Sequence, residues 1–159
     1  MQLPAPPRQP GTVGRPRKHG GELALAVWHL PQSNPFFYTL SQVIERHIDS
    51  PPVEPDAPDA FRFAVPGKLR DVLGQAGAIA LCERLLPFTI EAPLSLEDFW
   101  VLRIEMSEKL RQKIASLSPE QLSEVKREAL EAMGEYSTTR GMSFPAQVLI
   151  VSGSKKPSH

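Results

Sequence analysis

The candidates for chemistry in this sequence are a histidine and several aromatic residues at the end of its first apolar segment, residues 20–29, and shortly after it. They are Trp28, His29, Phe36, Phe37 and Tyr38. A histidine among aromatic side chains can accept a proton from a substrate or contact its polar group, while the rings form the wall of a pocket. The alternative is that Trp28 and Phe36 belong to the core and that His29 is an ordinary loop residue.

Three further candidates for a substrate pocket, Phe99, Met106 and Tyr136, lie within residues 95–136. They also fall on apolar stripes at helical spacing, and such stripes are more often core than ligand-binding surface. Cys82 has an acidic neighbour and no nearby basic residue or histidine, which favours a buried structural cysteine over a nucleophile. The four histidines lack the close spacing of a metal-binding pair. We therefore predict no catalytic residue, no cofactor-binding residue and no metal ligand.

The apolar pattern predicts the elements that would position these side chains. Residues 22–28 are apolar at every position except Glu22, which predicts a strand buried on both faces. Asn34 and Pro35 are typical of a helix N-cap and first helical position, and apolar residues follow at helical spacing as far as Ile48. The aromatic candidates are thus expected where a strand ends and a helix begins.

Two further strands are predicted downstream. A short helix over residues 69–76 is ended by a glycine, and a strand is expected over residues 78–86, closed by Pro87. Residues 144–152, rich in branched side chains, predict the last strand. Between these strands, two amphipathic helices are expected over residues 95–117 and 118–136, each beginning with a serine cap. We expect them to pack as a hairpin and to form a helical cap.

Composition excludes several classes of function. The chain has 159 residues, with 18 basic and 18 acidic side chains, so no net charge draws it to nucleic acid or to an anionic membrane. No apolar run is long enough to span a membrane. The single cysteine excludes an intramolecular disulfide framework. We therefore expect a cytoplasmic protein.

The first 19 residues differ sharply in composition from the rest. Residues 1–19 contain five prolines, four basic residues and no acidic residue, which predicts a disordered segment. Two other interpretations are a basic arm for nucleic acid, which lacks interleaved aromatic residues, and translation from a wrong start or reading frame. A short polar tail is expected at residues 157–159.

The order of elements resembles a known family. The segment GGELALAVWH is followed by a helix, a loop, a helix ending in Ala76 and Gly77, a strand, a helical insertion, and a strand reading FPAQVLIVSGSK. Over about residues 20–156 this order resembles the carboxyl-terminal half of class I S-adenosylmethionine (SAM) dependent methyltransferases. In that family the fifth strand commonly follows a proline–glycine–glycine turn and is close to LALAVW. Here His19 replaces the proline, whereas the two glycines and Trp28 match.

The resemblance implies an α/β fold, specifically part of a Rossmann-like sheet. It implies three strands in the family order 5-7-6, mixed in direction, and about four helices, including the cap at residues 95–136. In this order residues 22–28 pair with residues 144–152, which in turn pair with residues 78–86. The other edge of residues 22–28 would be covered by the family's fourth strand, for which the sequence offers no candidate.

The resemblance also implies methyl transfer from SAM to a small molecule. In the family, SAM binding depends on a GxGxG-like turn after the first strand and on an acidic residue, and neither is found here. We therefore expect the chain not to bind SAM, and not to be active, on its own. Two alternatives are a non-catalytic interaction module and one half of a split methyltransferase. Either would form a homo- or hetero-oligomer through the open edge of residues 22–28.

Overall fold

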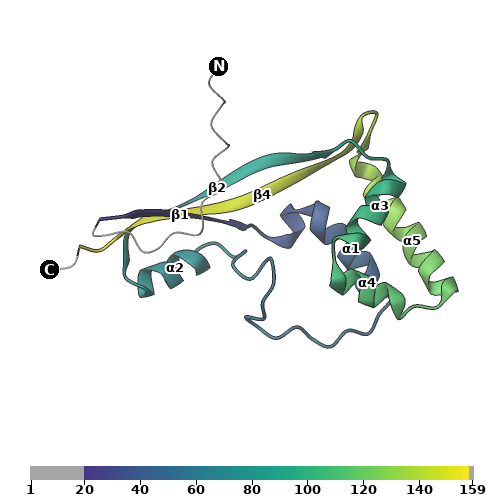
Figure 1. Cartoon of the computed structure of the whole chain (residues 1–159), viewed down its shortest axis with the longest axis horizontal. Helices are drawn as coiled ribbons and strands as arrows, with labels where there is room; N and C mark the ends of the chain where they lie inside the picture. The colour runs from purple at the N-terminus through teal and green to yellow at the C-terminus, as the bar shows by residue number, and fades with distance from the viewer. Residues whose placement is uncertain (1–19, 158–159) are drawn as a thin grey trace, which may run out of the picture.

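The computed structural model describes residues 20–157, where a long sheet carries most of the helices at one end and a single helix at the other (Figure 1). The strands are β1 (Glu22–Trp28), β2 (Ala78–Ala92), β3 (Ser137–Thr138) and β4 (Gly141–Lys155). The α-helices are α1 (Pro35–Arg46), α2 (Lys68–Gln75), α3 (Leu96–Glu105), α4 (Glu108–Ala115) and α5 (Pro119–Met133). Short 3-10 helices occupy Pro31–Ser33 and Gly134–Tyr136. The disorder predicted for residues 1–19 lies outside the described residues, and so do residues 158–159 of the predicted tail at 157–159.

The central strand of the sheet is β4, with β1 on one side and β2 on the other, as the sequence predicted. The predicted three-stranded mixed sheet is nevertheless wrong. Every pairing among the described strands is antiparallel, because β4 runs opposite to both of its neighbours. A fourth strand is present because the two residues of β3 fold back on the start of β4. The structure therefore establishes an α/β fold with a four-stranded antiparallel sheet.

Both long strands extend further than predicted, and Pro87 lies within β2 rather than closing it. The backbone of β4 shows why. His29 donates its N–H to Gln147 and Lys155 donates to Gly21, so the odd-numbered residues of β4 bond to β1 and the even-numbered ones to β2. Pro87 lies opposite Gln147, so its nitrogen faces the outer edge of β2, where the missing N–H breaks no ladder bond.

The sheet is covered on opposite faces at its two ends. Near the start of β4, Met142, Phe144 and Ala146 are buried, whereas later Leu149 and Val151 are buried instead. The pairing of β4 with β2 continues without a shift between these positions, so the buried side chains change from one face to the other. The first set joins the main core with α1, α3 and α5. The second faces the side on which α2 packs against β2 (Figure 1).

The helical cap differs from the predicted hairpin in one respect. Residues 95–117 form two helices, α3 and α4, because Ser107 begins a new helix and accepts a hydrogen bond from the Leu110 N–H. This raises the number of α-helices in the described residues from about four to five. Helix α5 begins at Ser118 with the predicted capping box. It packs against α1 and α3, and the side chains that they bury form the main core. The core residues include Leu40, Ile44, Phe99, Val125, Met133 and Phe144.

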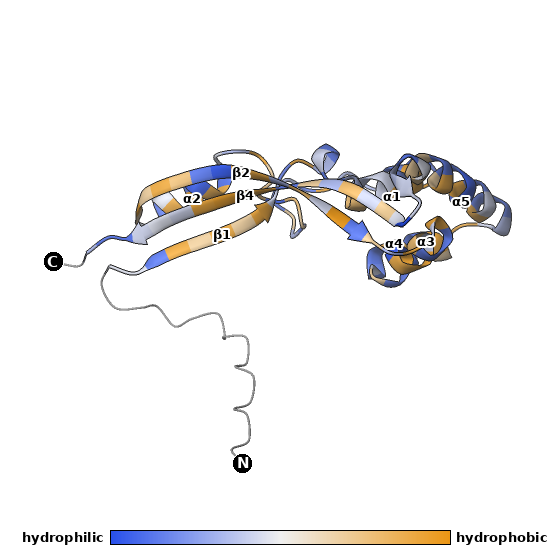
Figure 2. Cartoon of the chain, turned by 90° about the horizontal axis from the view of Figure 1, so that it is seen from above, coloured by the Kyte–Doolittle hydropathy of each residue, from blue (hydrophilic) through white to orange (hydrophobic). Residues whose placement is uncertain are grey.

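The prediction that residues 22–28 are buried on both faces is wrong. β1 is hydrophobic along most of its length (Figure 2), yet Ala24, Leu25 and Ala26 are exposed, Leu25 by 44%. The reason is that β1 pairs only with β4 and has no second neighbour among the described strands. None of the described helices is long and apolar enough to cross a membrane.

Candidate functional site

The exit from β1 is held in place by Asn34, the residue before α1. Its Nδ2 lies 3.1 Å from the carbonyl oxygen of His29, 3.2 Å from that of Leu30 and 3.1 Å from that of Gln147. Its Oδ1 accepts a hydrogen bond of 3.0 Å from the Gln147 N–H. Asn34 has the predicted N-cap position, but its side chain caps no helical N–H. It is fully buried and joins the loop after β1 to the backbone of β4 instead.

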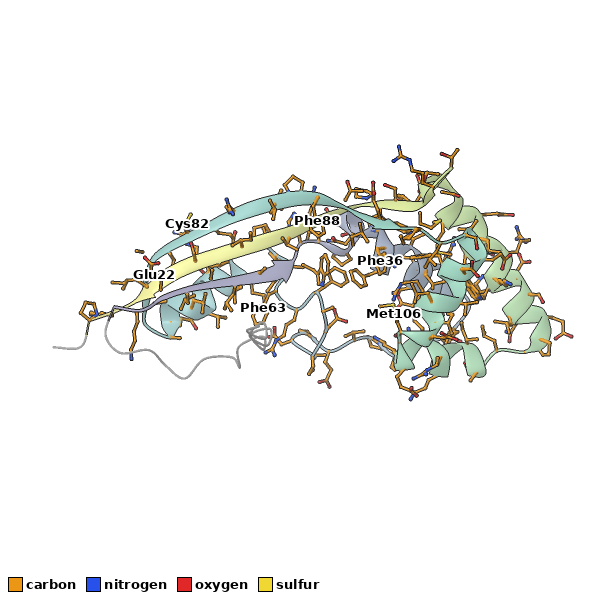
Figure 3. The ribbon with its side chains drawn as sticks, turned by 45° about the horizontal axis from the view of Figure 1, so that its top comes forward. Glu22, Phe36, Phe63, Cys82, Phe88 and Met106 are labelled. Atoms are coloured by element: carbon orange, nitrogen blue, oxygen red, sulfur yellow. The ribbon has the colours of Figure 1, made fainter. Side chains whose placement is uncertain are left out.

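Several of the predicted aromatic residues meet in one continuous series. Trp28 stacks at 6.2 Å on Phe88 of β2 and meets the edge of Phe37 at 4.9 Å. Phe37 meets Phe36 at 4.9 Å, and Phe36 meets Phe99 at 5.2 Å. All distances are between ring centroids. Figure 3 labels Phe36 beside α1 and Phe88 on β2.

The series runs from the protein surface into the core. Phe88 is 40% exposed, whereas Phe99 and its partner Phe144 are fully buried. Tyr136 contacts Phe144 at 5.0 Å and is partly buried. Phe99 is therefore a core residue, which leaves the exposed end of the series, around Trp28 and Phe37, as the part that a ligand can approach.

Besides His29, two of the predicted pocket residues are not part of this series. Met106 is 60% exposed, at the point where α3 ends (Figure 3). It lies on the predicted apolar stripe, but the turn at Ser107 directs it away from the core. Tyr38 is half-buried and takes part in no aromatic contact with the described residues. The structure thus brings together Trp28, Phe36, Phe37, Phe99 and, through Phe144, Tyr136.

His29 contacts a segment far away in the sequence. Its Nδ1 lies 3.1 Å from the carbonyl oxygen of Ala64, in the loop before α2. A carbonyl oxygen can only accept, so Nδ1 carries the hydrogen and Nε2 of the neutral ring is an acceptor. The histidine therefore anchors this loop to the end of β1, and its Nε2 is left as a hydrogen-bond acceptor.

Sequence reasoning missed Arg103, which packs against this aromatic series. It lies on α3, one helical turn after Phe99, and only 5% of its surface is exposed. Its Nε donates a hydrogen bond of 3.0 Å to the carbonyl oxygen of Phe36. Its guanidinium lies 5.2 Å from the ring centroid of Phe36 and 5.3 Å from that of Phe37. The only available signal was its place within the buried stripe of α3.

The electrostatics around Arg103 are unusual for a buried charge. No carboxylate of the described residues forms an ion pair with it, and burial lowers the pKa of its guanidinium. The first turn of α1, which it contacts, contains no acidic residue. Buried charges are normally paired, whereas Arg103 has no carboxylate partner among the described residues; it lies in the last turn of α3, where the negative end of that helix dipole partly offsets its charge.

A hollow lies beside β3. Its polar lining comes from Glu91, Thr138, Arg140 and Ser143. It contains none of the residues predicted from the sequence, and its two charged side chains are exposed. We assign no chemistry to this hollow, because its charged side chains are exposed.

Cys82 is exposed, so the prediction of a buried structural cysteine is wrong. It lies opposite Ser152 on the face of β2 that α2 does not cover. Residues 20–157 contain no group of three or more histidine, cysteine or acidic side chains that could hold a metal ion.

Comparison with known proteins does not assign the chain to a family. No protein-family model matches the chain, and no curated protein is significantly similar to it. The resemblance to class I methyltransferases therefore rests on the sequence pattern and stays a prediction.

Proposed function

We propose that residues 20–157 form the sheet-and-cap part of a class I SAM-dependent methyltransferase-like domain that acts on a small molecule. In this proposal the SAM-binding strands come from another polypeptide segment and add to the open edge of β1. The observation that carries the proposal is that edge: an apolar strand whose outward backbone groups pair with no other strand among residues 20–157.

The geometry of the edge is defined by the ladder with β4. Because the odd-numbered residues of β1 bond to β4, the even-numbered residues direct their N–H and C=O groups outwards. These residues are Glu22, Ala24, Ala26 and Trp28. None is a proline, and the pairing of β1 contains no bulge. The edge is therefore able to accept a further strand along its whole length.

The opposite edge of the sheet lacks this capacity. On β2, Pro87 removes one outward N–H, and the pairing shifts between Ile79 and Cys82, where Ala80 has a φ of 52°. Bulges and prolines are common means of protecting a strand edge from pairing. Within residues 20–157 the outer edge of β2 is thus protected, whereas that of β1 is left available.

One face of the sheet near β1 is also available. Ala24 and Ala26 share this face with Ile150 and Ser152, and no described helix covers it. Their small side chains would let a helix approach the sheet closely. In the family that the sequence resembles, the strands that bind SAM lie beyond the corresponding edge, and helices cover the faces of the sheet.

A second candidate is a non-catalytic interaction module. The same open edge favours it, because a strand of any partner, or β1 of a second copy, can pair there without SAM or catalysis. The two candidates differ in one respect: only the first requires a complex that binds SAM.

The test compares two proline variants of β1. Ala26→Pro removes an N–H that points to the open edge, whereas Leu25→Pro removes one that bonds to β4. We expect Ala26→Pro to fold with a nearly unchanged urea midpoint and Leu25→Pro to lose several kcal/mol of stability, about 3 kcal/mol or more. Ala26→Pro should also abolish association at the edge.

Binding measurements then separate the candidates. The purified chain is titrated with SAM by calorimetry, alone and after co-expression with the SAM-binding half of a class I methyltransferase. The methyltransferase proposal predicts SAM binding only in the complex, and loss of the complex in Ala26→Pro. Micromolar SAM binding by the chain alone would contradict it. A discrete dimer that binds neither the co-expressed half nor SAM would favour the interaction module. A monomer that pairs with no partner would contradict both candidate functions.

A further inference from the structure

We propose that Arg103 binds the anionic group of a small organic acid, with Trp28 and Phe37 contacting the apolar part of that molecule. The proposal rests on the proposed function only in taking this acid as the methyl acceptor. The binding site itself is argued from the contacts of Arg103 and can be tested without SAM.

The first step is that the guanidinium is incompletely satisfied. An arginine has five N–H groups, and here only the one on Nε bonds to a described residue, the carbonyl oxygen of Phe36. The two Nη nitrogens have no acceptor among residues 20–157. Their four N–H groups are arranged as a planar fork that matches a carboxylate in a bidentate geometry.

The second step is that the fork is reachable from solvent. Arg103 is 95% buried as a whole, since its exposed fraction is 5%. Yet no fully buried side-chain nitrogen or oxygen in the described residues lacks a hydrogen-bond partner. The Nη nitrogens, which have none, must therefore lie at the small part of Arg103 that solvent still reaches. The guanidinium therefore keeps some contact with solvent, although the side chain as a whole is nearly enclosed.

The third step is the character of the surroundings. Phe36 and Phe37 lie against the guanidinium, and Phe37 is also in contact with Trp28. The first turn of α1, which Arg103 contacts, contains no acidic residue and is positive by its dipole, whereas Arg103 itself lies in the last turn of α3, at the negative end of that helix. An anion is favoured by the charge, and an aromatic or apolar body is favoured by the rings. A small organic carboxylate meets both conditions, whereas a polyanion could not reach the guanidinium of an arginine that is only 5% exposed.

The alternative is a purely structural role, in which Arg103 only covers two phenylalanines and bonds to one carbonyl. The two roles differ in their response to a ligand. We would titrate the isotope-labelled chain with benzoate and with the neutral, similarly shaped benzamide, and follow amide and arginine Nε–H signals by NMR. Phenyl phosphate, as a third ligand, separates carboxylate from phosphate recognition.

We expect benzoate to bind at least about tenfold more tightly than benzamide, because a charge-assisted bidentate contact is worth roughly that factor or more. The shifts should centre on Phe36, Phe37 and the Arg103 Nε–H. In Arg103→Met the preference should fall to about twofold or less, and in the control Arg111→Met, where an exposed arginine is removed, it should be unchanged. Arg103→Lys should lose most of the preference, because it keeps the charge but not the fork.

Equal binding of benzoate and benzamide in the unmodified chain would overturn the proposal, and this result does not depend on any variant folding. So would benzoate shifts that centre on exposed basic residues. Failure of this proposal leaves the edge pairing and SAM binding of the proposed function untouched, because those are measured separately.

Discussion

Substitutions at Asn34 can distinguish two roles for its side chain, a cap for helix α1 and a bridge to the backbone of β4. The two roles tolerate different replacement residues. If Asn34 acted as an N-cap, aspartate and serine would replace it at little cost. In the structure its Nδ2 instead lies within 3.2 Å of three carbonyl oxygens. A carboxylate in that place would face three acceptors with no hydrogen to share. We therefore expect Asn34→Asp to be strongly destabilising.

The magnitude follows from the hydrogen bonds. The two hydrogens of Nδ2 and the acceptor Oδ1 give three bonds, so Asn34→Ala loses about 3 kcal/mol at ~1 kcal/mol each. The Gln147 N–H, left without its partner, adds about 1 kcal/mol or more. The sum is a large part of the ~5–15 kcal/mol that stabilises a typical domain. Asn34→Asp should cost at least as much at neutral pH.

The aspartate variant also has a predictable pH dependence. The surrounding carbonyls raise the pKa of the new carboxyl in the folded state above its ordinary value near 4. The folded protein then binds more protons than the unfolded chain above about pH 4, so the stability of the variant falls as the pH rises. Lowering the pH towards about 4 should therefore recover part of the loss, relative to the unmodified chain at the same pH.

Urea unfolding followed by circular dichroism measures these differences. The matched control is Ser118, which caps α5 through its side chain and belongs to a capping box. There Ser118→Asp should change the free energy of unfolding by less than about 0.5 kcal/mol, and Ser118→Ala should cost about 1 kcal/mol. If Asn34→Asp proved as stable as the unmodified chain, the bridge to β4 would be refuted and the capping role restored.

Three further predictions concern the backbone and two titratable or reactive side chains. Gly141→Ala should destabilise the protein by about 2 kcal/mol or more, because φ is +127° and a Cβ would lie 2.9 Å from the Leu94 nitrogen. Gly134→Ala, where a Cβ meets nothing within 4 Å, should be neutral or slightly stabilising; equal urea midpoints for the two variants would contradict this. Cys82 should react with a thiol reagent in the native state as fast as a free thiol, and a requirement for denaturant would show that it is buried. Burial and an adjacent carboxylate raise the pKa of Tyr136, so the folded state favours its neutral hydroxyl. The stability that this preference supplies should be lost as the pH rises above about 10. In Tyr136→Phe the urea midpoint should therefore fall less steeply in this pH range.

Local signals in the sequence were sufficient to predict the helices and strands, but not which of their residues are buried or which residues they contact. Strand β1, helix α1 and the capping box at Ser118 all follow from apolar period and capping residues, and each was predicted close to its observed place. The break at Ser107 was missed because the apolar stripe of residues 95–117 continues through it, and a serine in mid-stripe is a weak signal.

The remaining errors concern residues whose role depends on a neighbour distant in sequence. Pro87 ends a strand only if its nitrogen faces a partner, and this depends on the register with β4. The exposure of β1 and of Cys82 depends on which faces the helices cover. Arg103 has the appearance of a solvated helix residue until α1 packs over it. At the candidate site, the aromatic residues were predictable from their types, whereas the unpaired charge beside them was not.

The two-sided ladder of β4 has a consequence for hydrogen exchange. Its odd-numbered amides bond to β1 or to the loop after it, and its even-numbered amides bond to β2. If β1 opens more often than β2, protection along β4 should alternate from one residue to the next, with odd-numbered amides exchanging faster. A strand added at the edge of β1 would slow those amides alone. The exchange pattern of β4 therefore reports whether the open edge of β1 is occupied, and no reporter group has to be attached to the protein.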